Sequence, residues 1–284
     1  MIIDFHTHTF PKKISLQVVD KLSEASCTVH FTDGSQDGLK ASMKQARIDY
    51  SLVLPVATSP GQVEKINSGI IESMETLMSE GFISFGCMHP DYPDFKRELA
   101  QLKAAGIRGI KLHPTYQGMD LTDIRMMRVI YAASEVGLAV IIHAGWDIGI
   151  FDHDYASVDM ILKIIDEICP HDFILAHFGG WLNWDKVEKY LAGADVYMDT
   201  AFTVGDVTPL PGAPRPPFST RNLDNESFLR IMRKHGADRV LFATDSPWMD
   251  QSEYVRIFNE MPLSPSEREH IMHLNAERLL GLRS

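Results

Sequence analysis

The sequence predicts an α/β fold, a (β/α)8 TIM barrel that forms a single domain over residues 1–284. Short and almost continuously apolar runs alternate with longer stretches of helical spacing, a pattern typical of a parallel sheet buried by helices. The length of 284 residues is above the ~250 typical of one barrel and within its normal range. Polar residues follow several of the apolar runs. A doubly wound open sheet, the alternative, would spread these polar residues along one edge.

The predicted elements follow one another in a regular alternation. The eight apolar runs expected as strands are residues 2–6, 51–56, 82–88, 107–112, 138–143, 173–177, 195–199 and 239–244. The helical stretches between them include residues 61–80, 93–105, 121–136, 157–169, 184–192 and 224–235. A C-terminal helix is predicted over 265–281, because Ser264, Pro265 and Glu267 form a capping signal and Gly281 can end it.

Two segments exceed what a minimal barrel needs. Residues 26–37 extend the first connection between strand and helix, and residues 208–218 are rich in proline, which predicts a stiff loop after the seventh strand. Such a loop lies on the catalytic face of a barrel, so it either walls a pocket or is an ordinary surface excursion. Arg215 in this loop is expected to be a solvated surface residue rather than a group that binds an anionic substrate.

Composition and charge exclude several classes of protein. Hydrophobic residues make up 45% of the chain and charged residues 23%, as in ordinary globular proteins. The net charge of −11 disfavours nucleic acid and anionic membranes as partners. No apolar run approaches the ~18 residues of a membrane span, and the N-terminus lacks a signal-peptide pattern. The three cysteines lie far apart, which favours a reduced, cytoplasmic compartment. A homodimer is the default expectation for an oligomer.

Histidines gather at the ends of the predicted strands. His6 and His8 are two residues apart, so they are expected to project from the same side of the first strand. Four further strand-end residues join them in a barrel, because the carboxyl ends of its strands meet at one rim: Lys111, His143, His177 and Asp245. Each would otherwise be a buried polar group in need of a partner, and a shared divalent metal would satisfy them together. Histidine and carboxylate ligands suit zinc, manganese and iron.

These motifs resemble those of the amidohydrolase superfamily. The resemblance rests on Asp4-Phe5-His6-Thr7-His8, His143, Ala176-His177-Phe178-Gly179-Gly180 and Thr244-Asp245. The stretch Gly109–Pro114 and the ending Asn275–Leu282 are similar to the amidohydrolase-related branch that includes aminocarboxymuconate-semialdehyde decarboxylase. The likeness extends over nearly the whole chain and implies a barrel with a catalytic divalent metal, most often zinc.

The resemblance also implies roles for individual residues. The metal ligands would be His6, His8, His143 and Asp245, and Asp245 would also accept a proton from water. In members with one metal His177 would be the catalytic base or proton shuttle. In members with two metals His177 would bind the second, and a carboxylated Lys111 would bridge the pair. Lys111 could instead form a salt bridge or bind the carboxylate of a substrate.

Other residues near these strand ends are candidates for second-shell or substrate-binding roles. Asp4 has the same strand parity as His6, so it could orient a ligand imidazole or form a buried salt bridge. Trp181 and Trp248 closely follow the sixth and eighth strands and could line a pocket for a planar substrate, or simply pack under loops. His113 shares the parity of Lys111 and is expected near the substrate.

The expected function is a metal-dependent hydrolase acting on a small, carboxylate-bearing molecule. A catalytic metal can lower the pKa of its bound water from 15.7 to about 7, which would supply much of the acceleration. Non-oxidative decarboxylation of a small unsaturated or aromatic carboxylic acid is the close alternative, because the nearer relatives carry it out. A metal-binding barrel without catalysis is the third possibility. The substrate itself is not readable from the fold.

Overall fold

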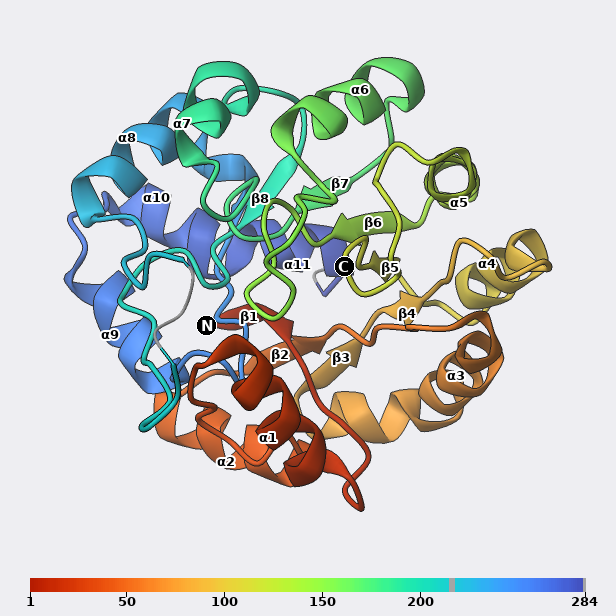
Figure 1. The fold of residues 1–284 in the computed structure, drawn as a ribbon, viewed down its shortest axis with the longest axis horizontal. Helices are drawn as coiled ribbons and strands as arrows, with labels where there is room; N and C mark the ends of the chain where they lie inside the picture. The colour runs from red at the N-terminus through yellow and green to blue at the C-terminus, as the bar shows by residue number, and fades with distance from the viewer. Residues whose placement is uncertain (215–217, 283–284) are drawn as a thin grey trace.

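The computed structural model, which describes residues 1–214 and 218–282, is a ring of parallel strands surrounded by helices (Figure 1). All eight predicted runs contain strands, although residues 82–88 form two short strands on either side of Phe85. The strands are β1 (Ile3–Thr7), β2 (Tyr50–Val53), β3 (Phe82–Ser84), β4 (Gly86–Cys87), β5 (Gly109–Leu112), β6 (Ala139–Ile142), β7 (Phe173–Leu175), β8 (Tyr197–Asp199) and β9 (Val240–Leu241). The predicted barrel is thereby confirmed.

Hydrogen bonds join the strands into a closed ring. The order β1-β2-β3 continues as β4-β5-β6-β7-β8-β9, and the paired strands within each of these two series are parallel. The amide of Phe85 donates to the carbonyl of Val53 at 3.2 Å, beside the break between β3 and β4. The amide of Phe5 donates to the carbonyl of Phe242 at 2.8 Å, which ties the last strand to the first.

Helices follow the strands around the outside of the ring. Those expected from the sequence are α3 (Val63–Ser79), α4 (Phe95–Ala104), α5 (Ile124–Glu135), α6 (Val158–Ile168), α7 (Trp184–Lys186) with the π-helical turn η2 (Val187–Leu191), and α8 (Asn225–His235). The C-terminal helix is α10 (Pro265–Glu269), the π-helical turn η4 (His270–Leu274) and α11 (Asn275–Leu280). Short 3-10 turns are η1 (Pro60–Gln62) and η3 (Ala237–Arg239). Three further helices were not predicted from the sequence: α1 (Ser15–Ser26), α2 (Gln36–Ala46) and α9 (Gln251–Glu260).

The two extra segments contact each other. Residues 26–37 are not one loop, because α1 ends at Ser26 and α2 begins at Gln36. The link between these helices pairs with the proline-rich loop: Thr28 bridges Pro209, and the amide of Leu210 donates to the carbonyl of Cys27 at 2.8 Å. Phe218 at the end of this loop packs against Trp181, with ring centroids 5.2 Å apart. Arg215 lies outside the described residues.

Two apolar clusters fill the fold and leave one end of the ring free for polar groups. The larger cluster lies between strands and helices, and the smaller one contains strand residues from around the ring together with Leu279 and Leu280 of α11. In Figure 1, α11 lies behind the strands, so it covers one end of the ring. The polar strand-end residues therefore gather at the opposite end. None of the helices in the described part of the chain is long and apolar enough to span a membrane.

Candidate metal centre

Three side chains from the two joined ends of the ring point their ligand atoms at one another. His6 Nε2 and His8 Nε2 are 3.1 Å apart, and Asp245 Oδ1 lies 3.4 Å from His6 Nε2 and 3.2 Å from His8 Nε2. Metal bonds of about 2.0–2.2 Å at roughly tetrahedral or octahedral angles would separate ligand atoms by about 3.0–3.5 Å. The three donors thus have the spacing of ligands on one side of a single metal ion.

Hydrogen bonds fix the histidine tautomers that a metal requires. His8 Nδ1–H donates to the carbonyl of Leu54 at 2.9 Å, and His6 Nδ1 lies 2.7 Å from Asp199 Oδ2. Burial lowers the pKa of His6 well below its ordinary value, so its ring is neutral and its single hydrogen faces the carboxylate. In a neutral His8 ring the hydrogen is likewise on Nδ1, and two unprotonated Nε2 atoms then face each other at 3.1 Å. Their lone pairs repel, and a cation between them would remove the repulsion, so the donor set fits a divalent metal.

Asp199 and Lys111 form the buried charged layer beneath these ligands. Asp199 Oδ1 accepts from the amides of His177 at 2.9 Å and Ala201 at 3.0 Å, while its other oxygen holds His6. Burial raises the pKa of Asp199 to about 7 and lowers that of Lys111 to about 8, and each group opposes the shift of the other. Lys111 Nζ lies 3.5 Å from His6 Nε2.

His143 and His177 form a hydrogen-bonded pair beside the three ligands. His177 Nε2 lies 3.0 Å from His143 Nδ1, and His177 Nδ1 lies 3.0 Å from the carbonyl of Ala201. His143 Nε2 faces the carbonyl of Trp146 at 3.1 Å. In this arrangement His143 is not one of the three mutually facing ligands. Burial lowers the pKa of both rings, that of His177 to about 4.

A second polar group adjoins this pair on the side of β5 and β6. The rings of His113 and His143 stack with centroids 4.3 Å apart at 15°, and Asp147 Oδ2 lies 3.6 Å from His113 Nε2 and 3.8 Å from His143 Nε2. The three residues are buried and close enough to hold a cation. Nearly parallel rings do not direct both lone pairs at one point, so the arrangement favours a hydrogen-bonding role.

Two of the site residues have strained backbones. His177 has φ of 58° and Asp245 has φ of 66°, in the left-handed region that non-glycine residues avoid. The amide of Asp245 donates to the carbonyl of His6 at 2.9 Å, which holds this conformation. Such strain costs about 1–3 kcal/mol per residue and clusters at functional sites.

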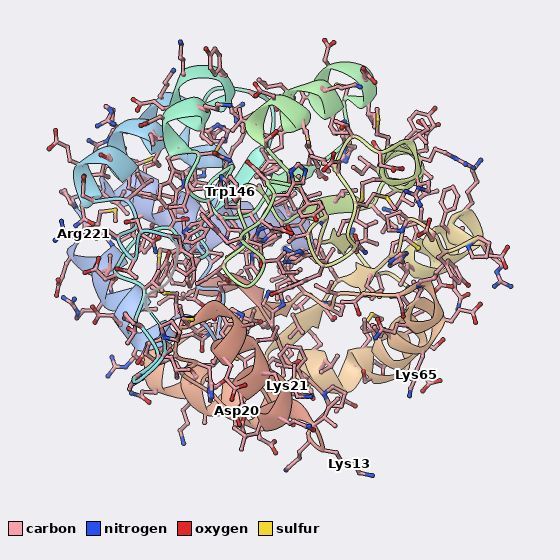
Figure 2. All side chains as sticks on the ribbon, viewed as in Figure 1. Lys13, Asp20, Lys21, Lys65, Trp146 and Arg221 are labelled. Carbon is pink, nitrogen blue, oxygen red and sulfur yellow. The ribbon has the colours of Figure 1, made fainter. Side chains whose placement is uncertain are left out.

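The ligand atoms open into a large cavity of about 1170 Å³. The four residues predicted to contact substrate all line it: Lys111, His113, Trp181 and Trp248. Trp181 donates from Nε1 to Asn222 at 3.0 Å, which fixes its ring. Trp146 lies near the middle of the ring in this view (Figure 2) and also lines the cavity.

Asp4 does not orient an imidazole, and it has no ion pair within residues 1–214 and 218–282. Its carboxylate accepts from Thr244 and from Gln251 of α9, and its only contact with His6 is with the backbone amide. The reason is a bulge: Asp4 pairs with Ser51 and Thr7 with Val53, so β1 carries one extra residue between them. The extra residue breaks the alternation that placed Asp4 and His6 on one face.

Two other acids, Asp199 and Asp147, contact the imidazoles of the site, and neither was predicted from the sequence. Asp199 is the last residue of β8, and Asp245 lies shortly after β9. An acid at the end of a strand was therefore the signal that could have identified Asp199 as a site residue. Asp147 lies in the loop four residues after His143, where nothing in the periodicity marks it.

A comparison of the sequence with known protein families identifies the family of this chain. Residues 3–282 match the family model described as amidohydrolase. The chain belongs to the amidohydrolase family. No curated protein matches this amidohydrolase by sequence.

Solved structures share the fold at low sequence identity. A 2,6-dihydroxybenzoate decarboxylase from Rhizobium is 13% identical over 99% of this chain and 98% of its own, with a TM-score of 0.68. A 5-carboxyvanillate decarboxylase from Novosphingobium aromaticivorans, complexed with manganese and 4-hydroxy-3-methoxy-5-nitrobenzoic acid, is 14% identical over 99% and 96%, with a TM-score of 0.67. A probable 2-pyrone-4,6-dicarboxylic acid hydrolase from Acinetobacter baumannii, with citric acid bound, is 14% identical over 99% of both chains, with a TM-score of 0.64.

Proposed function

We propose that this amidohydrolase is a metal-dependent hydrolase of a carboxylate-bearing organic molecule. The observation that carries the proposal is the set of three mutually facing ligand atoms of His6, His8 and Asp245, which opens directly into the cavity. The three donors lie on one side of the metal position, and a site that stays open toward substrate is typical of catalytic rather than structural metal sites. A divalent metal bound there would supply Lewis-acid polarisation and acidify a water molecule.

We propose His143 as the fourth ligand and zinc as the metal, with manganese or iron as alternatives. His143 is buried, lines the cavity and contacts His177, whose ring centroid lies 5.4 Å from that of His6. Imidazole and carboxylate donors suit all three metals. The manganese in the decarboxylase from Novosphingobium aromaticivorans supports manganese as a candidate for this fold.

The remaining residues divide the work of binding and proton transfer. In this proposal Asp245 accepts a proton from the attacking water at its carboxylate, and His177 passes a proton to the leaving group. Lys111 holds the carboxylate of the substrate, and His113, Trp181 and Trp248, which line the cavity as Lys111 does, contact the rest of it.

Decarboxylation is the second candidate. Its support is that two of the structural neighbours are decarboxylases of aromatic acids that occupy the same fold over nearly their whole length. The same cavity offers His177 as a proton donor to carbon and Lys111 beside the departing carboxylate.

We further propose a cytoplasmic location and a homodimer. All three cysteines are free, which supports a reducing compartment.

One experiment separates the two reactions. The protein is loaded with zinc or manganese and offered esters, lactones and amides that bear a carboxylate, alongside aromatic carboxylic acids, in water enriched in oxygen-18. Hydrolysis places the heavy oxygen in the product without release of carbon dioxide. Release of carbon dioxide with no heavy oxygen in the organic product would overturn hydrolysis in favour of decarboxylation. Failure to turn over any compound of either class would favour a metal-binding barrel without catalysis.

A further inference from the structure

The cavity at the metal centre extends well beyond the strand ends. It continues as a groove between α1 and α3, two helices on the same side of the ring in Figure 1. On α3 the lining residues recur at helical spacing and include Ile66, Ile70, Ser73 and Leu77. Because positions three and four apart share one face of a helix, the groove runs along the length of α3 rather than crossing it.

The opposite wall has the same character. The lining residues of α1 include Val18 and Leu22, again four positions apart, and Val53 of β2 also lines the cavity. From Ile66 to Leu77, α3 rises about 16 Å at 1.5 Å per residue. An extended alkyl chain advances about 1.25 Å per carbon for bonds of ~1.5 Å, so this wall matches roughly twelve carbons.

The groove carries positive charge, whereas the molecule as a whole is negative. Lys21 of α1 and Lys65 of α3 both line it and are labelled in Figure 2. Neither has an ion-pair partner within residues 1–214 and 218–282, whereas Lys12 in the same cavity pairs with Asp37 at 2.6 Å. In a chain of net charge −11, two uncompensated lysines beside an apolar stripe favour an anionic amphiphile over a neutral or cationic one.

We propose that this groove binds the alkyl chain of the substrate, and that the substrate class is a medium-chain aliphatic carboxylate or its derivative. The polar, reacting end lies at the metal centre and the chain lies between α1 and α3. The inference rests on the proposed function for the identity of the reacting end. Continuity with the metal centre favours this occupant over a protein partner, because a ligand in the groove reaches the site itself.

Gly69 allows the groove to be blocked cleanly. It lines the groove on α3, and a Cβ atom added there meets nothing within 4 Å. Phenylalanine at this position therefore projects into open space, and it also favours the helix more than glycine does. Met78 on the same helix is exposed and is not part of the lining, so Met78→Phe is the matched control.

The test is calorimetric titration of linear carboxylates from four to fourteen carbons, below their micelle concentrations, with metal-loaded and metal-free protein. Affinity should rise about fourfold per added methylene up to roughly twelve carbons and then level off. Gly69→Phe should remove most of this dependence while butanoate binds as before, and Met78→Phe should behave like the wild type.

Two results would overturn the proposal. One is an affinity that does not change with chain length. The other is a Gly69→Phe variant that keeps the full dependence. Sedimentation of both proteins identifies the competing occupant: a wild-type dimer that Gly69→Phe converts to monomers, without chain-length dependence, makes the groove an interface between copies. Because alkyl contacts need no metal, chain-length dependence in the metal-free protein would persist even if the proposed reaction were wrong.

Discussion

The Asp199 carboxylate lies 2.7 Å from His6 Nδ1 and accepts two backbone amide hydrogens through its other oxygen. It therefore fixes both the ring orientation and the tautomer of His6, and leaves Nε2 free to bind a metal. Two segments of the site, the end of β1 and the turn at His177, depend on this one buried acid.

Replacing Asp199 should weaken metal binding without removing a ligand. Asp199→Ala should lower metal affinity by about 10–100-fold, because His6 can then adopt the wrong tautomer. Competition with a chromophoric chelator measures the change. Asp195→Asn, which alters an exposed acid before the same strand, is the control and should bind metal normally. Unchanged affinity in Asp199→Ala would show that His6 is not a ligand held by this carboxylate.

His143→Ala should strip the metal, because the site loses one of only four proposed ligands. Elemental analysis of the variant purified without chelators should give far less than the wild-type content. The fold itself should survive, since His143 contacts other polar groups rather than the apolar core. Full metal occupancy together with normal turnover would contradict its assignment as a ligand.

His177→Ala distinguishes the mononuclear from the binuclear site. With one metal, the variant should retain its metal and lose at least about 100-fold in turnover, because a positioned general acid or base contributes roughly 10²–10⁴-fold. Metal content and activity are measured on the same sample. Loss of half of a two-metal complement would instead indicate that His177 binds a second metal bridged by a carboxylated Lys111.

Asp4 should contribute to stability rather than to catalysis. Its buried carboxylate accepts hydrogen bonds from the amide and hydroxyl of Thr244, from Gln251 and from the amide of His6, so Asp4→Ala leaves four donors without this acceptor. The expected loss is about 2–4 kcal/mol in the free energy of unfolding. Denaturant unfolding of metal-free protein measures it. A loss below about 0.5 kcal/mol would show that this clamp between β1 and the Asp245 turn is unimportant.

His235 should make stability depend on pH. Burial lowers its pKa in the folded protein to about 4 from an ordinary value of 6.5, so the unfolded chain binds the proton more tightly. Its contribution is present above about pH 6.5 and is lost as the pH falls toward 4. Between pH 7 and pH 5 the wild type should lose about 2 kcal/mol more than His235→Asn, a variant that keeps an acceptor for the amide of Gly193. Equal losses in denaturant unfolding would contradict this.

Strand positions followed from the sequence because buried parallel strands are apolar throughout. The runs at 107–112 and 138–143 correspond to β5 and β6 within a few residues, and both were expected to end in polar side chains. Closure of the ring then brings Asp245 to His6, a contact that local pattern alone does not specify. The helices α1 and α2 were missed because α2 is polar, with Gly38 inside it and three buried residues.

The misplacement of Asp4 has a different cause. Alternation assumes a regular strand, and one extra residue in β1 shifts every side chain beyond it to the other face. No residue type in Asp4–Thr7 signals that bulge. Asp199 was overlooked since its role depends on a contact with His6, 193 positions away in sequence.

The most direct test of the account is the number of metal ions per chain in protein purified without chelators and reconstituted with zinc or manganese. The account predicts about one per chain, falling to near zero when His6 and His8 are both replaced by alanine. Two per chain, with mass evidence of carboxylated Lys111, would extend the site to a bridged pair. Absence of bound metal in the reconstituted wild type would contradict the central claim.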